Sequence, residues 1–249
     1  MQYALSAALL GVGADALKAG VDFELANRKL QALDAGQSTA LQLSELSRTA
    51  RGLGESSIFT AAEVANLQVS LKKLGLSSKD VNDLSGQLVK FATAMDTTAE
   101  VAGGAVVKNI NRFNNVLDPT LTQQEKATKI SREFANATVN SALGFETLNT
   151  SLSYAGPVAA SLGFTFAETT AILGKLADAG FEGSKAGTVL RKILTSIAKE
   201  GGGITNVKED LAGLIDDNTQ FAEVLDIVGL RAVSGTLSLK GLGDEVKEL

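Results

Sequence analysis

This chain of 249 residues lacks two of the side chains that enzymes use most, because it contains neither histidine nor cysteine. Histidine is the usual general base near neutral pH and a common zinc ligand, and cysteine supplies disulfides and thiolate metal sites. A Ser–His–Asp or Cys–His mechanism is therefore impossible within the chain. We expect no catalytic residue, no metal site, no cofactor and no small-molecule substrate.

The segment GFEGSKAG, residues 180–187, superficially resembles a phosphate-binding loop. That motif has four residues between a glycine and a Gly-Lys-Ser/Thr run, and it follows a strand. Here Gly183 is followed by Ser184 and then by Lys185, and no strand is predicted before it. We therefore predict a loop without nucleotide binding, in which the Gly183-x-x-x-Gly187 spacing lets helices approach closely.

Three pairs of adjacent acids could in principle support hydrolysis: Glu209-Asp210, Asp216-Asp217 and Asp244-Glu245. Paired carboxylates hydrolyse sugars only with a substrate cleft and one raised pKa, and the sequence indicates neither. The run from Asp216 to Asn218 also lacks the spaced oxygen ligands and central glycine of an EF-hand loop. We expect these acids to be solvated at helix ends.

The charge of the chain argues against tight binding of nucleic acid. The net charge is −5, the isoelectric point is about 5.0, and no block of five basic residues occurs. Stable binding to a phosphate backbone needs clustered lysine and arginine. An acidic or neutral surface could still line a conduit through which DNA slides.

The elements that carry these residues are predicted to be helices. Hydrophobic residues make up 45% of the chain, aromatic residues only 5%, and prolines number two. Apolar side chains recur every three or four positions in 64–74, 81–95 and 189–197. This pattern predicts an all-α fold, a multi-helix array of short-to-medium helices in which longer helices could pack between subunits.

Local signals mark where these helices begin and end. Helix starts are predicted where a hydroxyl residue precedes an acid by three positions, at Thr60/Glu63, Ser77/Asp80, Thr97/Glu100 and Thr165/Glu168. Helix ends are predicted at Gly75, Gly163 and Gly180. Loops are expected at 117–122, where Asp118 precedes Pro119, at 180–187 and at Gly201–Gly203. We expect the part from Ile204 onward to pack less firmly.

Two stretches of the chain resemble each other. LGLSSKDVNDLSGQLVKFATAMD, residues 74–96, and LGFTFAETTAILGKLADAG, residues 162–180, share a Leu-Gly, a hydroxyl cap, an acid three positions on and an apolar helix. Either the chain contains a duplicated helical hairpin, or it uses the same local pattern twice.

The first twenty residues, MQYALSAALLGVGADALKAG, are the most apolar stretch. No basic residue precedes Lys18, as a signal peptide would require. About 14 uncharged residues precede Asp15, fewer than the ~20 that cross a bilayer. We predict an apolar leading helix that is buried or faces another subunit; the alternative is a segment that enters a membrane after release from a particle.

The order of several motifs carries a family resemblance. Residues 20–33 form an opening helix, and residues 46–81 a helix, a Gly turn, a Ser-Ile-Phe-Thr cap and a second helix. Residues 151–198 contain a turn at Tyr154–Val158, the Leu162-Gly163 stop, a helix from Glu168, a loop at 183–188 and a helix bearing Leu190-Arg191. Gly229, Arg231 and Ala232 close the series. In this order, Val21 to Leu239 resembles the conserved core of phage tail tape measure proteins; residues 118–140 depart from it by being more polar.

The resemblance implies a structural protein that is not an enzyme. It would determine tail length and take part in tail assembly, and it would lie in the lumen of the virion tail near the tip and help DNA ejection. Its implied partners are further copies of itself, commonly three, with tail tube proteins, distal hub proteins of the baseplate and, transiently, phage DNA and the host membrane. An alternative is a membrane-inserting helical protein that forms a DNA conduit across the host envelope. A third possibility, a muralytic enzyme, has no matching motif.

The domain organisation follows from these signals. We expect an apolar leading helix at 1–20, a helical tape measure core at 21–200 and a C-terminal helical segment at 201–249 after the triple glycine. The chain is short for such a protein, which usually contains a very long helical tract, so it resembles the compact core of the family.

Overall fold

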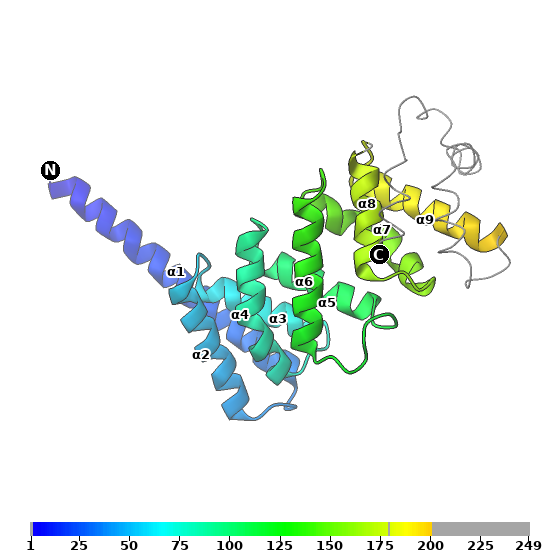
Figure 1. Cartoon of the computed structure of the whole chain (residues 1–249). Helices are drawn as coiled ribbons and strands as arrows, with labels where there is room; N and C mark the ends of the chain where they lie inside the picture. Colours follow the sequence, from blue (N-terminus) through cyan, green and yellow to red (C-terminus); the bar gives the residue numbers. More distant parts are fainter. Residues whose placement is uncertain (1, 179, 201–249) are drawn as a thin grey trace. The chain divides into compact units, whose positions relative to one another are not determined.

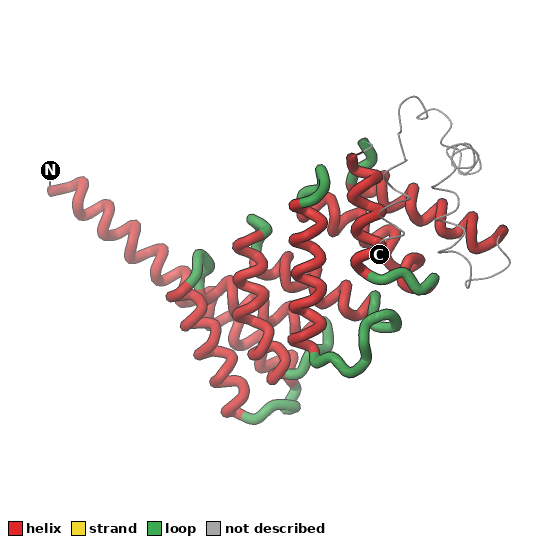
Figure 2. The backbone as a smooth tube through the Cα atoms, in the orientation of Figure 1, coloured by secondary structure: helices red, strands yellow, loops and turns green. Residues whose placement is uncertain are grey.

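A computed structural model describes residues 2–178 and 180–200, and within these ranges the chain is helical with no strand (Figures 1 and 2). The all-α prediction is therefore confirmed. The helices are α1 Gln2–Asp34, α2 Ala40–Ser56, α3 Ala61–Lys73, α4 Ser78–Ala94, α5 Ala99–Arg112, α6 Gln123–Val139, α7 Phe145–Ser161, α8 Phe166–Asp178 and α9 Gly183–Glu200.

The helices divide between two compact units. Unit 1 comprises residues 1–108 with 122–128, and unit 2 comprises 109–121 with the chain from 129 onward. Helix α1 runs through residue 20 without interruption, and its first half extends beyond the other helices of unit 1 (Figure 1). The predicted divisions at residues 20 and 200 stay predictions, and the triple glycine and the segment after it lie outside the described residues.

The core of unit 1 forms where α3 packs against α1, α2 and α4. Leu46, Leu67, Leu71, Leu84 and Leu88 are completely buried. Burying such side chains contributes roughly 1.5–3 kcal/mol each, which explains why their helical spacing was a reliable signal. The periodic stripes predicted at 64–74 and 81–95 are these buried faces.

The core of unit 2 is built around phenylalanines. The ring of Phe166 in α8 lies 5.4 Å from that of Phe113 and 5.0 Å from that of Phe134, centroid to centroid. The ring of Phe145 in α7 lies 5.3 Å from that of Phe134 in α6. Such tilted and edge-on pairs contribute about 0.5–1.5 kcal/mol each beyond the area that they bury. Three helices, α6, α7 and α8, therefore meet at one aromatic cluster.

Most predicted helix starts are confirmed. Thr60 forms a complete capping box with Glu63, and Thr165 does so with Glu168. The Ser77 hydroxyl accepts from the Asp80 backbone N–H at 3.1 Å. Two starts were not predicted, Thr39 with Gln42 and Thr122 with Glu125, although both have the same reciprocal hydrogen bonds. Thr39 pairs with the amide side chain of Gln42, whereas the predicted starts all have an acid at that position.

One predicted start, Thr97, is wrong by one residue. The hydroxyl that accepts from the first turn of α5 belongs to Thr98, at 3.3 Å from the Val101 nitrogen. The Thr97 backbone N–H instead donates to the Ala92 carbonyl at 3.1 Å, so Thr97 completes the end of α4. The Glu100 carboxylate accepts from the Ser70 hydroxyl of α3 and is not part of a box.

All three predicted glycine stops are confirmed. Gly75, Gly163 and Gly180 have φ of +91°, +82° and +86°, a region that suits glycine because it has no Cβ. After each glycine the next N–H reaches five residues back along the helix, at 3.3 Å for Leu76, 3.0 Å for Phe164 and 2.8 Å for Phe181. This is the Schellman arrangement, which satisfies carbonyls at the end of a helix.

Three predicted turns are wrong. Gly52 and Gly54 lie inside α2, Tyr154–Val158 lies inside α7, and Gly183–Thr188 begins α9. Pro157 is tolerated within α7 because Pro157 and Ser153 are exposed, which leaves the Ser153 carbonyl open to water. Of the loop predicted at 180–187, only the first three residues are outside the helix.

The predicted loop at 117–122 is confirmed, and the polar stretch at 118–140 is not only a connection. Most of it forms α6, which buries Ala127, Ile130 and Phe134 on one face. The helix is polar overall because its other faces are exposed, and its narrow apolar stripe supplies the packing.

Candidate functional site

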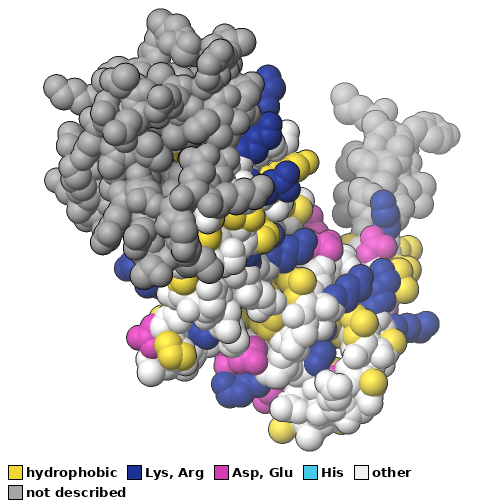
Figure 3. Space-filling model, turned by 90° about the vertical axis from the view of Figure 1, so that its right-hand side faces the viewer, with side chains coloured by type: hydrophobic (Ala, Val, Ile, Leu, Met, Phe, Trp, Pro, Cys, Tyr) yellow, Lys and Arg dark blue, Asp and Glu magenta, His cyan; other side chains and the backbone are white. Residues whose placement is uncertain are grey.

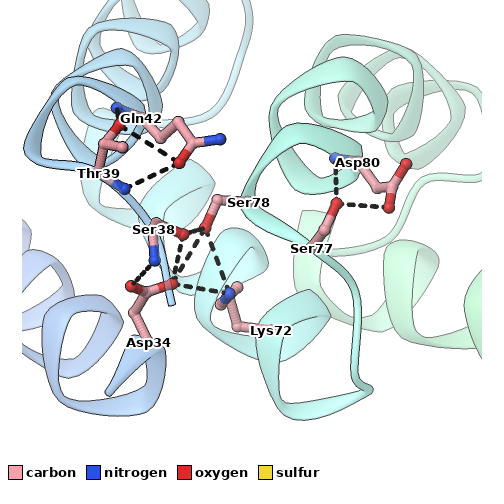
Figure 4. A network of polar contacts seen from close by, with 8 residues as sticks. All are labelled: Asp34, Ser38, Thr39, Gln42, Lys72, Ser77, Ser78 and Asp80. Carbon is pink, nitrogen blue, oxygen red and sulfur yellow. Dashed lines mark hydrogen bonds and ion pairs between the residues drawn. The ribbon is translucent and has the colours of Figure 1, made fainter. Parts of the chain in front are cut away.

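A buried group of charged and polar side chains lies in unit 1, where α1 ends. Asp34 is 1% exposed, and its carboxylate accepts from the Lys72 ammonium at 3.0 Å. The same carboxylate accepts from the backbone N–H of Ser38 at 2.7 Å and from the hydroxyls of Ser38 and Ser78. Figure 4 shows these side chains converging on Asp34 from the ends of α1 and α3 and from the start of α4.

These contacts hold Asp34 in its charged form. The hydrogen bonds from Ser38, opposed by burial and supported by Lys72, lower the pKa of Asp34 from 3.8 to about 2. Lys72 also contacts the Ser78 hydroxyl at 3.2 Å. The cluster therefore ties the ends of α1 and α3 to the start of α4.

A second candidate is a groove of about 560 Å³ in unit 2, between α6 and α8. Its walls combine small and charged residues, among them Glu133, Ala137, Thr170, Gly174, Lys175 and Asp178. The Asp178 carboxylate accepts from the Ala142 backbone N–H at 3.0 Å. Glu133 in α6 and Asp178 at the end of α8 are the two acidic residues among those that line the groove.

A third candidate is an apolar stripe on α1. Leu17, Val21 and Leu25 are 73%, 66% and 49% exposed and lie four positions apart, so they share one face of the helix. The opposite face buries Phe23, Ala26 and Leu30. Helix α1 therefore has one apolar face packed within unit 1 and a second one open to solvent, which we call the α1 stripe.

The residues singled out in the sequence do not converge on one site. Within the described part of the chain, no three acidic side chains are close enough to hold a metal ion. The acid pairs at 209–210, 216–217 and 244–245, and Gly229, Arg231 and Ala232, lie outside the described residues. On the face shown in Figure 3, basic and acidic side chains are scattered among apolar ones.

The glycine motif at 183–187 has a packing role. A Cβ added to Gly187 would lie 2.3 Å from the carbonyl oxygen of Ser151 in α7. Helices α7 and α9 thus touch through their backbones, as the small-residue spacing predicted. The α1 stripe and the α6–α8 groove were not predicted, because exposure and missing volume depend on the tertiary arrangement.

No helix among the described residues is both long enough and apolar enough to span a bilayer. This finding includes α1, whose apolar first half gives way to charged residues from Asp15 onward.

Comparison with known proteins gives a consistent result. Residues 47–248 match the family described as phage-related minor tail protein. The chain is 26% identical to the tape measure protein of Pneumococcus phage Dp-1, over 97% of this chain and 22% of that protein. It is 25% identical to a probable tape measure protein of Escherichia phage P2, over 86% of this chain and 25% of that protein. The chain thus spans a quarter or less of these relatives, and no solved structure matches it.

Proposed function

The chain belongs to the phage-related minor tail protein family, and on that premise we propose that it is the folded core of a tape measure protein, a structural component of the virion tail. The observation that carries the proposal is the match over 97% of the chain to a tape measure protein. The family resemblance noted in residues 21–239 points the same way.

In this proposal the chain acts near the tail tip, in the lumen of the tube. The relatives are four to five times longer than the segment that they share with this chain, so the length-setting tract would lie elsewhere in such proteins. The compact helical units would anchor that tract to tube and hub proteins and help DNA ejection. The net charge of −5 suits a wall past which DNA slides, since clustered basic residues would retain the DNA.

The proposal includes contact between copies, commonly three. The α1 stripe supports it, because exposed Leu17, Val21 and Leu25 offer apolar area that a neighbour could cover. The expected organisation stays part of the proposal: a leading helix at 1–20, a core at 21–200 and a C-terminal segment at 201–249. No enzymatic role is proposed, since no described group has the geometry for one.

A second candidate is a helical protein that inserts into the host envelope and forms a DNA conduit. The α1 stripe favours it as well, because it continues from the apolar first twenty residues. No described helix could span a bilayer, so insertion would need several copies or a shallow interfacial position.

Affinity purification of the full-length viral protein with its tail partners tests the first candidate. We expect tube and hub proteins to copurify, and a triple change of Leu17, Val21 and Leu25 to glutamine to weaken contact between copies while leaving helical content unchanged. A monomeric protein that binds neither tube nor hub proteins would contradict the proposal. Leakage of dye from anionic vesicles tests the second candidate, and no leakage by the full chain would exclude it.

A further inference from the structure

Helices α5 and α9 approach their neighbours through a glycine at the same place, the fifth residue of each helix. A Cβ added to Gly103 would lie 2.3 Å from Leu67 Cδ1 in α3, and one added to Gly187 would lie 2.3 Å from the Ser151 carbonyl oxygen in α7. Each glycine follows its contact residue by 36 positions, and the two glycines are 84 positions apart.

The buried faces of these two helices also coincide. Of the eight buried residues of α5, six have a buried counterpart in α9 at the same distance of 84 positions. The exceptions are Ala99 and Val107, since Gly183 is half-buried and Arg191 is exposed. Three such pairs are Ala102/Ala186, Val106/Leu190 and Ile110/Leu194. The agreement spans more than two turns, so the two helices present the same face to their neighbours.

The helices that precede them correspond in the same way. Both α2 and α6 have 17 residues, and Leu46/Ile130 and Ala50/Phe134 are buried pairs 84 positions apart. The turns that follow share a hydrogen bond. The Phe59 N–H donates to Ser57 Oγ at 3.2 Å, and the Leu143 N–H donates to Ser141 Oγ at the same distance.

The hairpins α3–α4 and α7–α8 also correspond, but the distance between counterparts grows by four residues, about one helical turn, within them. The buried pair Val64/Leu148 is 84 positions apart, whereas the stops at Gly75/Gly163 and the buried pair Leu84/Ile172 are 88 apart. Helix α7 is four residues longer than α3, and α8 is four residues shorter than α4. Four residues are close to one turn of 3.6, so the insertion and the deletion leave the buried faces in place.

We infer that α2–α5 and α6–α9 are two copies of one four-helix module. Repeated local signals would explain recurring caps and stops, but they give no reason for contacts between helices to recur. A duplication explains both, including the return of the distance to 84 after the shifted hairpin. Of the two explanations that residues 74–96 and 162–180 left open, the contacts favour the duplicated hairpin, as part of a larger repeat.

The duplication also accounts for the groove between α6 and α8. In the first copy, Leu53 Cδ2 lies 3.8 Å from the Cβ position of Gly86, which closes the contact between α2 and α4. The counterparts in the second copy are Ala137 and Gly174, and both line the groove. The groove therefore lies at the contact between the first and third helices of the module. It is open in the second copy because Ala137 takes the place of Leu53.

Exposed apolar residues do not repeat. Ile58 is 75% exposed and its counterpart is Ala142, while Val139 is 79% exposed and its counterpart is Glu55. The two copies thus share an interior and differ in their surfaces. Such divergence is expected when the copies face different neighbours in an assembly.

A graft into the full chain tests the inference. The 14 residues of α5, Ala99–Arg112, replace residues 183–196, which puts Gly103 at the place of Gly187. The buried polar side chain Asn109 brings its own partner, because Arg112 donates to its Oδ1 at 2.8 Å. The matched control grafts Ser78–Phe91 of α4, which keeps the buried face in register but puts Asn82 at the place of Gly187.

Amide hydrogen exchange in α7 is the readout. If the modules are copies, the α5 graft keeps protection factors within about tenfold of the parent chain, and the α4 graft lowers them by about a hundredfold or more. Protection that is equally good in both grafts, or equally lost in both, would overturn the inference, since α5 would then have no special fit to the second module.

Discussion

The backbone of Gly187 lies against that of Ser151, with no room for a Cβ between the glycine and the Ser151 carbonyl oxygen. This contact joins α9 to α7 through backbone atoms. It makes the interior of the unit sensitive to a single methyl group.

We expect Gly187→Ala to destabilise the chain by about 3 kcal/mol, at the upper end of the cost of overpacking a core. The matched control is Gly52→Ala, also inside a helix, where an added Cβ meets nothing within 4 Å. That change should stabilise by about 0.5–1 kcal/mol, because alanine is the better helix former. Urea unfolding of both variants measures the two effects, and equal stability would contradict the close contact.

The same substitution at Gly103 should cost less than at Gly187. The 2.3 Å neighbour of an added Cβ at Gly103 is Leu67 Cδ1, the end of a flexible side chain, and not a backbone atom. We expect Gly103→Ala to cost about 1 kcal/mol after Leu67 changes rotamer. Gly104→Ala, with nothing within 4 Å, is the adjacent control and should be neutral or stabilising. A larger loss at Gly103 than at Gly187 would reverse the expected order.

Asp34→Asn should destabilise the chain by about 3 kcal/mol, because it leaves the Lys72 ammonium buried without its counter-charge. The exposed pair of Lys79 and Asp83, at 2.6 Å, provides the control, and Asp83→Asn should change stability by less than about 1 kcal/mol. Chemical denaturation at pH 7 distinguishes the two positions. A mild effect at Asp34 would mean that the buried cluster is not formed.

The same carboxylate predicts a pH dependence. The pKa of Asp34 is lowered in the folded chain from 3.8 to about 2, so the folded state holds the proton less tightly than the unfolded state. The stabilisation is complete above pH ~5 and is lost as the pH falls through 3.8 and then through about 2. Unfolding midpoints measured between pH 6 and 2 should therefore fall less steeply in Asp34→Asn than in the parent chain. Parallel profiles would contradict the lowered pKa.

The cap of α5 distinguishes the structure from the sequence expectation. Thr98→Ala should cost about 1 kcal/mol because the Thr98 hydroxyl accepts from Val101 in the first turn. Thr97→Ala, the neighbouring change, should cost less than about 0.5 kcal/mol because the Thr97 backbone and not its hydroxyl makes the contact. Thermal unfolding of the two single variants measures the difference. A larger loss of stability in Thr97→Ala than in Thr98→Ala would support the helix start predicted from Thr97 and Glu100.

Sequence reasoning succeeded where structure is local. Gly75, Gly163 and Gly180 end helices because their backbone conformation depends on the residue itself, and Thr60 and Thr165 begin helices because their partners lie three positions away. It failed at Pro157, where a helix continues because its exposed face tolerates a missing hydrogen bond. It also failed at Gly183–Gly187, where packing against α7 favours a helix over the loop that glycines usually indicate.

The candidate surfaces were beyond sequence reasoning for a different reason. The α1 stripe consists of Leu17, Val21 and Leu25, which are indistinguishable in sequence from the buried Phe23 and Leu30 beside them. The groove between α6 and α8 depends on the small side chain at Ala137, whose importance emerges only by comparison with Leu53. Exposure and missing volume are properties of the assembled helices.

A reconstruction of the intact virus particle, with the protein labelled by a tag inserted after Asp118 in the exposed 117–122 loop, tests the central proposal most directly. We expect density for the helical core inside the tail tube near its tip, with the tag at the same level in every particle. A mature particle with full-length tails that lacks this protein from its tail would contradict the proposal that the chain is a tape measure core.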